Sequence, residues 1–280
     1  MKRILVPTDF SEEANNALDG AIQLAKMGGG EILLLHVIES TENQSFNEMG
    51  EISHSNPENK LFILQMMKVA KGKMSKIKSD HQDLTIIDMV KVGHPFHNIS
   101  ETIVDEKVDI VIMGSRGTSG MEEILVGSNA ERVVRYAKCP VITIKHSIDF
   151  SGIKTIAFAS DLSTSQNNTV QQLQVLQRLL DAKLKIVKVN THSDWVTDRE
   201  LNTLLARFVS ENKIENFDFT SYNARYIEDG IIHFAEDKEV DMIAMATHGR
   251  TGFAHVIAGS VAEDLVNHSK RPIWTCSIKN

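Results

Sequence analysis

The residues with the clearest chemical potential in this sequence are three glycines and a serine. Gly114 and Gly117 are followed, after nine further residues, by the pair Gly127-Ser128. Glycine lets backbone N–H groups approach a phosphate closely, and the N-terminus of a helix adds about half a positive charge. The spacing therefore predicts a phosphate-binding segment, provided that Gly114 ends a strand and Ser128 opens a helix. Gly114 and Gly117 alone are also typical of an ordinary turn.

A carboxylate stands at a second position where a ligand could bind. Asp9 comes shortly after the apolar run at residues 4–6. In open α/β sheets, ligands bind at the carboxyl ends of the strands where the strand order reverses, and a carboxylate there commonly accepts hydrogen bonds from ribose hydroxyls. We therefore interpret Asp9 as a candidate ribose ligand.

Short apolar runs alternate with helical patterns, and together they define the elements that must position these residues. Continuous apolar runs are typical of strands buried in a parallel sheet, and they occur at residues 4–6, 32–37, 84–90, 110–113 and 141–144. Helical periodicity occurs between and beside them, at residues 11–27, 61–77, 96–104 and 128–136. The alternation predicts right-handed βαβ units and an open, doubly wound, Rossmann-like α/β sheet.

The same order recurs in the second half of the chain. Asp9 and Asp161 match at an offset of 152 residues, whereas Gly127 and Gly259 match at an offset of 132. The second copy therefore lacks about twenty residues, and the polar segment 41–60 of the first copy is the natural candidate. We expect two tandem domains, residues 1–147 and 148–280, each with its own open parallel sheet.

The last apolar run of each domain would end its sheet and leave an unpaired edge. These runs cover residues 140–144 and 272–276. Soluble proteins normally cover such edges, and antiparallel pairing of the two runs would satisfy both at once. We expect the domains to pack as a pseudo-twofold pair, an internal imitation of a homodimer, with Trp274 at the seam. The whole chain could also form a homodimer through other surfaces.

The composition indicates a folded protein without nucleic-acid or membrane partners. The chain has 280 residues, 42% of them hydrophobic, and a net charge of −7. An acidic balance opposes broad binding to phosphate backbones, which requires clustered Lys and Arg. No apolar stretch approaches the length of a membrane span or a signal sequence, and the two cysteines lack metal-ligand spacing. We expect a cytoplasmic protein with no metal bound by its own side chains.

The spaced glycines, the Asp9 segment and the end of the second strand together carry a family resemblance. The pattern Gly114-x2-Gly117-x9-Gly127-Ser128, the opening segment 6–11 and the segment 36–38 resemble the universal stress protein family, and the similarity covers both halves. The resemblance implies that Asp9 binds ribose, that the Val37 main chain binds adenine, and that Pro7 and Met113 line the base pocket. The residues that it implies around the phosphates of ATP are Gly114, Gly117, Gly127, Ser128, Asn129 and Ala130.

The second half departs from this pattern. Ala246 replaces the first motif glycine and Ala159 replaces Pro7. An alanine adds a methyl group and disfavours positive φ, so that close backbone approach could be blocked. We expect the second half to bind ATP more weakly or not at all. Its candidate residues are Asp161, Val189, Gly249, Gly259 and Ser260.

Three functions remain open at the level of the sequence. The resemblance favours an ATP-binding stress protein that acts through nucleotide-dependent regulation or interaction, with Mg²⁺ carried by the ATP phosphates. The alternatives are a slow ATP hydrolase or adenylyl-transfer enzyme, and a scaffold that binds no ligand. No P-loop lysine, no dinucleotide fingerprint after the first strand and no legible nucleophile set occurs in the sequence. These absences and the intact first motif favour non-catalytic binding.

Overall fold

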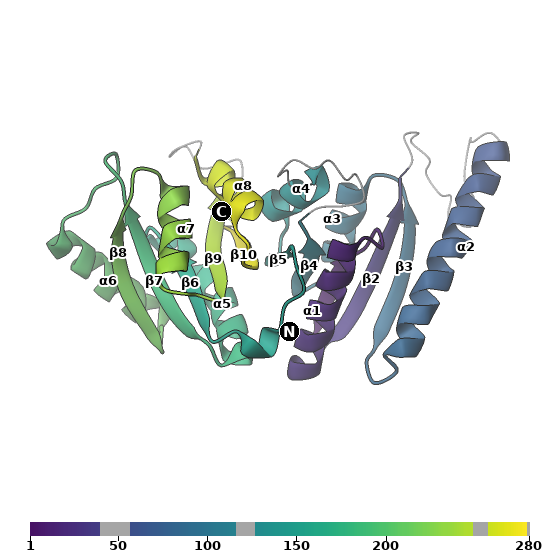
Figure 1. Cartoon of the computed structure of the whole chain (residues 1–280), viewed down its shortest axis with the longest axis horizontal. Helices are drawn as coiled ribbons and strands as arrows, with labels where there is room; N and C mark the ends of the chain where they lie inside the picture. The colour runs from purple at the N-terminus through teal and green to yellow at the C-terminus, as the bar shows by residue number, and fades with distance from the viewer. Residues whose placement is uncertain (40–56, 116–126, 249–256, 279–280) are drawn as a thin grey trace.

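The computed structural model describes residues 1–39, 57–115, 127–248 and 257–278. Strands and helices alternate along the chain, with a sheet between two layers of helices (Figure 1). The elements of the first half are β1 (Arg3–Pro7), α1 (Glu12–Gly28), β2 (Glu31–Ile38), α2 (Pro57–Asp80), β3 (Ile86–Val92), α3 (Pro95–Asp105), β4 (Ile110–Gly114), α4 (Ser128–Tyr136) and β5 (Val141–Ile144). The predicted βαβ alternation is confirmed, although β3 begins two residues later than expected.

The second half repeats this order after a short connecting 3₁₀ helix, η1 (Phe150–Gly152). Its elements are β6 (Thr155–Ala159), η2 (Thr164–Gln166), α5 (Asn167–Leu180), β7 (Lys183–Asn190), α6 (Asp198–Asn212), β8 (Phe217–Asn223), α7 (Ile227–Asp237), β9 (Met242–His248), α8 (Ile257–His268) and β10 (Ile273–Ile278). Among the described helices, none has both the length and the apolar character needed to cross a membrane.

All ten strands belong to one sheet, in the order β3-β2-β1-β4-β5-β10-β9-β6-β7-β8. The expectation of two separate sheets is therefore wrong, and the reason is the predicted edge pairing itself. β5 and β10 pair antiparallel, with Trp274 opposite Ile142, while every other neighbouring pair is parallel. Because both edges are satisfied by the same hydrogen bonds, the two sheets become continuous. The symmetric strand order confirms the pseudo-twofold pairing of the halves.

The hydrophobic core also runs through both halves. On one face of the sheet, side chains from α1, α2, α5 and α6 form a single buried cluster that includes Trp274. On the other face, α3, α4, α7 and α8 form a second one. The connection between the halves is packed into the first cluster, since Phe150 is fully buried. Gln23 of α1 holds this connection by donating to Ile148 O and accepting from Phe150 N.

Trp274 provides a test of how much the seam contributes to stability. Its side chain is fully buried, whereas the chain's other tryptophan, Trp195, is 66% exposed. Trp274→Ala is expected to lower the free energy of unfolding by about 3–5 kcal/mol, because it removes a large buried ring and leaves a cavity. Trp195→Ala is the matched control and should change that free energy by less than about 0.5 kcal/mol. Urea unfolding measures both, and equal effects would contradict the assigned role of the seam.

Candidate functional site

A cavity of about 430 Å³ opens at the carboxyl ends of the first-half strands. Its size falls within the usual range for small-molecule sites. Nearly all the residues singled out in the first half line it, and they come from β1, β2, β4 and the start of α4: Pro7, Asp9, Val37, Met113, Gly114, Gly127, Ser128, Asn129 and Ala130. Gly117 lies outside the described residues. The structure thus brings into one cavity residues that are far apart in the sequence.

The order of the strands sets the order of the functional groups along the cavity. β1 lies between β2 and β4 in the sheet, so Asp9 lies between Val37 on one side and Gly114 on the other. This is a point where the strand order reverses, the usual ligand position in an open α/β sheet. Neighbouring strands are about 4.8 Å apart, so the outer two of these strands are separated by about 10 Å.

The main chain of Val37 faces the cavity because β2 extends beyond β1. The N–H of Thr8, one residue past the end of β1, donates to Leu35 O at 2.8 Å. Carbonyls two residues apart on a strand point the same way, so Val37 O points past the end of β1. The Val37 side chain is half-buried and lines the cavity. A planar ligand at this position could bond directly to the strand.

Asp9 is held by a tight turn between β1 and α1. The Thr8 hydroxyl accepts from Phe10 N at 3.0 Å, and Asp9 Oδ1 accepts from Ser11 N at 3.0 Å. Phe10 adopts a φ of 64°, a left-handed conformation that costs a non-glycine residue roughly 1–2 kcal/mol. These side-chain bonds offset that cost. Ser11 then caps α1 by accepting from Ala14 N. The turn fixes the Asp9 carboxylate at the edge of the cavity.

The N-terminus of α4 supplies backbone donors to the same cavity. The N-cap residue is Gly127, in an extended conformation, and Ser128 is the first helical residue. The first N–H groups of a helix have no partner within the helix, and here they belong to cavity-lining residues, Ser128 to Ala130. They favour a negatively charged group at this end of the cavity. The expectation that Ser128 opens this helix is confirmed.

Gly114 stands at the end of β4 without a positive φ, and its lack of a side chain matters for packing. The described glycines with positive φ are Gly29 and Gly93, and Gly114 is not among them. A Cβ added at Gly114 would lie 2.8 Å from Glu13 Cβ and 3.0 Å from Glu13 C, closer than side chains tolerate. The missing side chain therefore lets the first turn of α1 pack directly on the end of β4.

The cavity also contains residues that the sequence did not single out. They are Thr8, Ala14, Leu35, Glu39, Pro95 and Ile99. Pro95 opens α3 and Ile99 follows one turn later, so α3 forms a wall whose position depends on packing between distant elements. Two of these residues could have been found from the sequence, because Thr8 is next to Asp9 and Glu39 directly follows the second strand. Within the described ranges, no group of three or more His, Cys, Asp or Glu is arranged to hold a metal ion.

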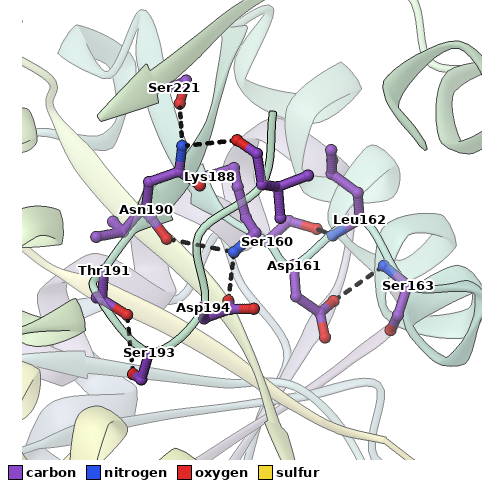
Figure 2. A network of polar contacts seen from close by, with 12 residues as sticks. Ser160, Asp161, Leu162, Ser163, Lys188, Asn190, Thr191, Ser193, Asp194 and Ser221 are labelled. Atoms are coloured by element: carbon purple, nitrogen blue, oxygen red, sulfur yellow. Dashed lines mark hydrogen bonds and ion pairs between the residues drawn. The ribbon is translucent and has the colours of Figure 1, made fainter. Parts of the chain in front are cut away.

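The second half has the same turn after its first strand as the first half, but the residues around this turn pack differently. Asp161 Oδ1 accepts from Ser163 N at 2.9 Å, and Leu162 has a φ of 63°, as at Asp9 and Phe10 (Figure 2). Val189, however, is buried, and a Cβ added at Gly230 of α7 would lie 2.6 Å from its Cγ1. The α7 backbone thus packs directly against Val189.

The remaining second-half candidates lie around α8. Gly259 and Ser260 fall inside this helix, which begins at Ile257, so α8 does not begin at the motif as α4 does. Gly249 is outside the described residues. Asp161 and Val189 lie at the ends of β6 and β7, at the positions that Asp9 and Val37 hold at the ends of β1 and β2.

Comparisons with known proteins agree with this architecture. The model of the universal stress protein family matches residues 1–145 and 223–277. A universal stress protein from Synechocystis is 27% identical over 98% of this chain and 99% of its own length. One from Methanocaldococcus jannaschii is 35% identical over 51% of this chain and 94% of its own length. The crystal structure of a universal stress protein from Archaeoglobus fulgidus covers 99% of this chain and 98% of that one, with a TM-score of 0.78 and 22% identity.

A doubly wound α/β sheet with a cavity at its strand-order switch point defines a tandem protein with a Rossmann-like fold. The matched family model covers most of the chain, and the Synechocystis relative aligns with it from end to end. This chain therefore belongs to the universal stress protein family, in its tandem two-domain form.

Gly114 and its second-half counterpart allow a test of the packing at β4. Gly114→Ala is expected to lower the free energy of unfolding by about 1–3 kcal/mol, because the new methyl group must displace the first turn of α1. Ala246→Gly, the reverse exchange, should cost only about 0.5–1 kcal/mol. Thermal unfolding without nucleotide measures both, and an unchanged melting temperature for Gly114→Ala would disprove the close contact with Glu13.

Proposed function

We propose that the first half of this protein binds one molecule of ATP, with Mg²⁺ held by the ATP phosphates. The observation that carries the proposal is the convergence of Val37, Asp9 and the N-terminus of α4 on one cavity. Their order across the sheet matches the order of base, ribose and phosphates in a nucleotide. The family resemblance implies the same assignment for each of these residues.

The chemistry of the cavity fits this ligand from end to end. Apolar Pro7 and Met113 and the outward-facing main chain of Val37 suit the face and edge of an adenine ring. Asp9 is a hydrogen-bond acceptor and, as an anion, suits ribose hydroxyls better than phosphates. The backbone N–H groups at the start of α4 suit phosphate oxygens. Mg²⁺ would neutralise part of the phosphate charge, without needing a side-chain cluster of its own.

We propose that the nucleotide acts as a regulatory ligand and not as the substrate of rapid turnover. The groups described in the cavity suit binding and orienting a nucleotide. The Asp9 carboxylate accepts a hydrogen bond in the turn that precedes α1, which suits a positioning role. Slow hydrolysis is the alternative enzyme activity. Prolonged incubation with ATP and Mg²⁺, followed by chromatography of the products, distinguishes the two, because only an enzyme would release more ADP than there are protein chains.

Ligand identity is tested directly on the purified protein. Mass spectrometry of small molecules released by denaturation is expected to find ATP. A universal stress protein solved in complex with cAMP, 16% identical to this chain, covers 45% of it and 98% of that chain with a TM-score of 0.37. Competition titrations should therefore include cAMP beside ATP. Absence of adenine nucleotides from the released material, together with no binding of added ATP, would overturn the proposal.

Asp9→Ala separates the binding role of this carboxylate from its structural role. Charge-assisted hydrogen bonds to ribose contribute roughly 1.5–3 kcal/mol, so the variant is expected to bind ATP about tenfold to a hundredfold more weakly. Isothermal titration calorimetry measures this change.

Asp161→Ala is the matched control, because Asp161 makes the same turn in the second half. Both variants should lose a similar amount of thermal stability, of order 1 kcal/mol. Only Asp9→Ala should lose ATP affinity. Equal ATP affinity in both variants would show that Asp9 serves the turn alone.

A further inference from the structure

A lysine is buried at the carboxyl edge of the second half. The Lys188 side chain is only 5% exposed, and its ammonium forms an ion pair with Asp194, in the segment between β7 and α6 (Figure 2). The same Nζ donates to Val189 O at 3.3 Å. Burying an ammonium group costs several kcal/mol unless it is paired and hydrogen-bonded. Both partners of Lys188 are therefore needed to keep it there.

In the first half, beside the described cavity, a different residue stands at this position. His36 is the residue 152 positions before Lys188, and its Nδ1 donates to Thr8 O at 2.7 Å, within the turn region. Its ring packs against Phe10, with centroids 4.7 Å apart. His36 thus holds the β1 turn, and it is not one of the residues that line the cavity.

The Val189 carbonyl that Lys188 contacts is equivalent to the Val37 carbonyl. Ser160 N donates to Val187 O at 3.0 Å, as Thr8 N does to Leu35 O. Val189 O, two residues further along β7, therefore points past the end of β6, just as Val37 O points past the end of β1. In the first half this direction leads to the cavity. In the second half it leads to the lysine ammonium.

We propose that Lys188, held by Asp194, closes the second half to nucleotides by occupying the main-chain acceptor that a base would need. This inference rests on the proposed function, since it takes the Val37 main chain as the contact for adenine. An entering base would have to displace the Lys188 hydrogen bond and separate a charge pair. The chain would then bind one ATP molecule, in its first half, and the second half would remain closed to nucleotides.

The neighbouring contacts make the closed arrangement rigid. Asn190 Nδ2 donates to Ser221 Oγ at 3.1 Å, linking β7 to β8, and Ser160 Oγ donates to Gln166 Oε1 at 2.5 Å. Asp194 itself is 56% exposed. Removal of the lysine therefore leaves a hydrated carboxylate and not a buried charge, so Lys188 can be replaced without a large penalty.

The test counts ATP molecules bound per full-length chain by equilibrium dialysis with labelled ATP and Mg²⁺. Lys188→Met keeps most of the side-chain length and removes the N–H donors. Lys188→His introduces the first-half residue and is the second variant should the first one fold poorly. Lys185→Met is the matched control, because Lys185 lies on the same strand but donates to the distant Lys238 O. Thermal unfolding checks the fold of each variant.

The expected result is one ATP per chain for the unmodified protein and for Lys185→Met, and two for either Lys188 variant. In the Asp9→Ala background, the Lys188 variants should gain at least tenfold in affinity at the second site. One ATP per chain in all Lys188 variants would overturn the closure by Lys188 but leave the proposed function intact. Two ATP per chain in the unmodified protein would have the same two consequences. No ATP in the unmodified protein but one in the Lys188 variants would support closure and refute the proposed first site. No ATP in any variant would refute both.

Discussion

The antiparallel pairing of β5 with β10 is the interaction on which the rest of the structure depends. Only Val141 to Thr143 pair with Ile273 to Thr275, yet this ladder turns two five-stranded sheets into one. The helices on each face can then share a core that crosses the seam, and Trp274 is buried within it. Without this ladder each half would present an unpaired apolar edge. The pseudo-twofold arrangement is therefore a requirement of the sheet and not only a result of duplication.

Duplication within one chain also provides an internal comparison. Both halves form the same turn, with an aspartate accepting from the residue two positions on and a non-glycine residue at positive φ. The aspartate is therefore explained in both halves by local backbone chemistry. What differs lies in the surroundings: the residue at the end of the second strand, the contact of α7 with Val189, and the starting point of the last helix. The presence of Asp161 can therefore be explained by the turn alone, whether or not a ligand binds beside it.

The sequence was sufficient to predict the order of elements, the duplication, the edge pairing and most residues of the first cavity. The first three follow from local periodicity and internal repetition, and the rule that ligands bind at the carboxyl ends of parallel strands pointed to Asp9 and Gly127-Ser128. The family resemblance implied the other cavity residues, such as Pro7 and Met113. The close packing of Gly114 on Glu13 was missed, because it joins residues about a hundred positions apart. In the second half, Ala246 stands at the Gly114 position, and a 3₁₀ turn at Thr164–Gln166 replaces the first turn of the helix. The wall formed by α3 was missed for the same reason, since its place depends on packing across the fold.

The long separation of β5 and β10 along the chain has a consequence for synthesis on the ribosome. β5 is complete about 130 residues before β10, and at the usual rate of 5–20 residues per second that interval lasts roughly 7–26 seconds. During it the nascent first half carries an apolar strand edge whose partner has not been made. Chains growing side by side on one messenger present the same edge to each other, so exchange of β10 between neighbouring chains competes with closure within one chain. We therefore expect the speed of elongation over the second half to affect how often β10 pairs with β5 of a neighbouring chain.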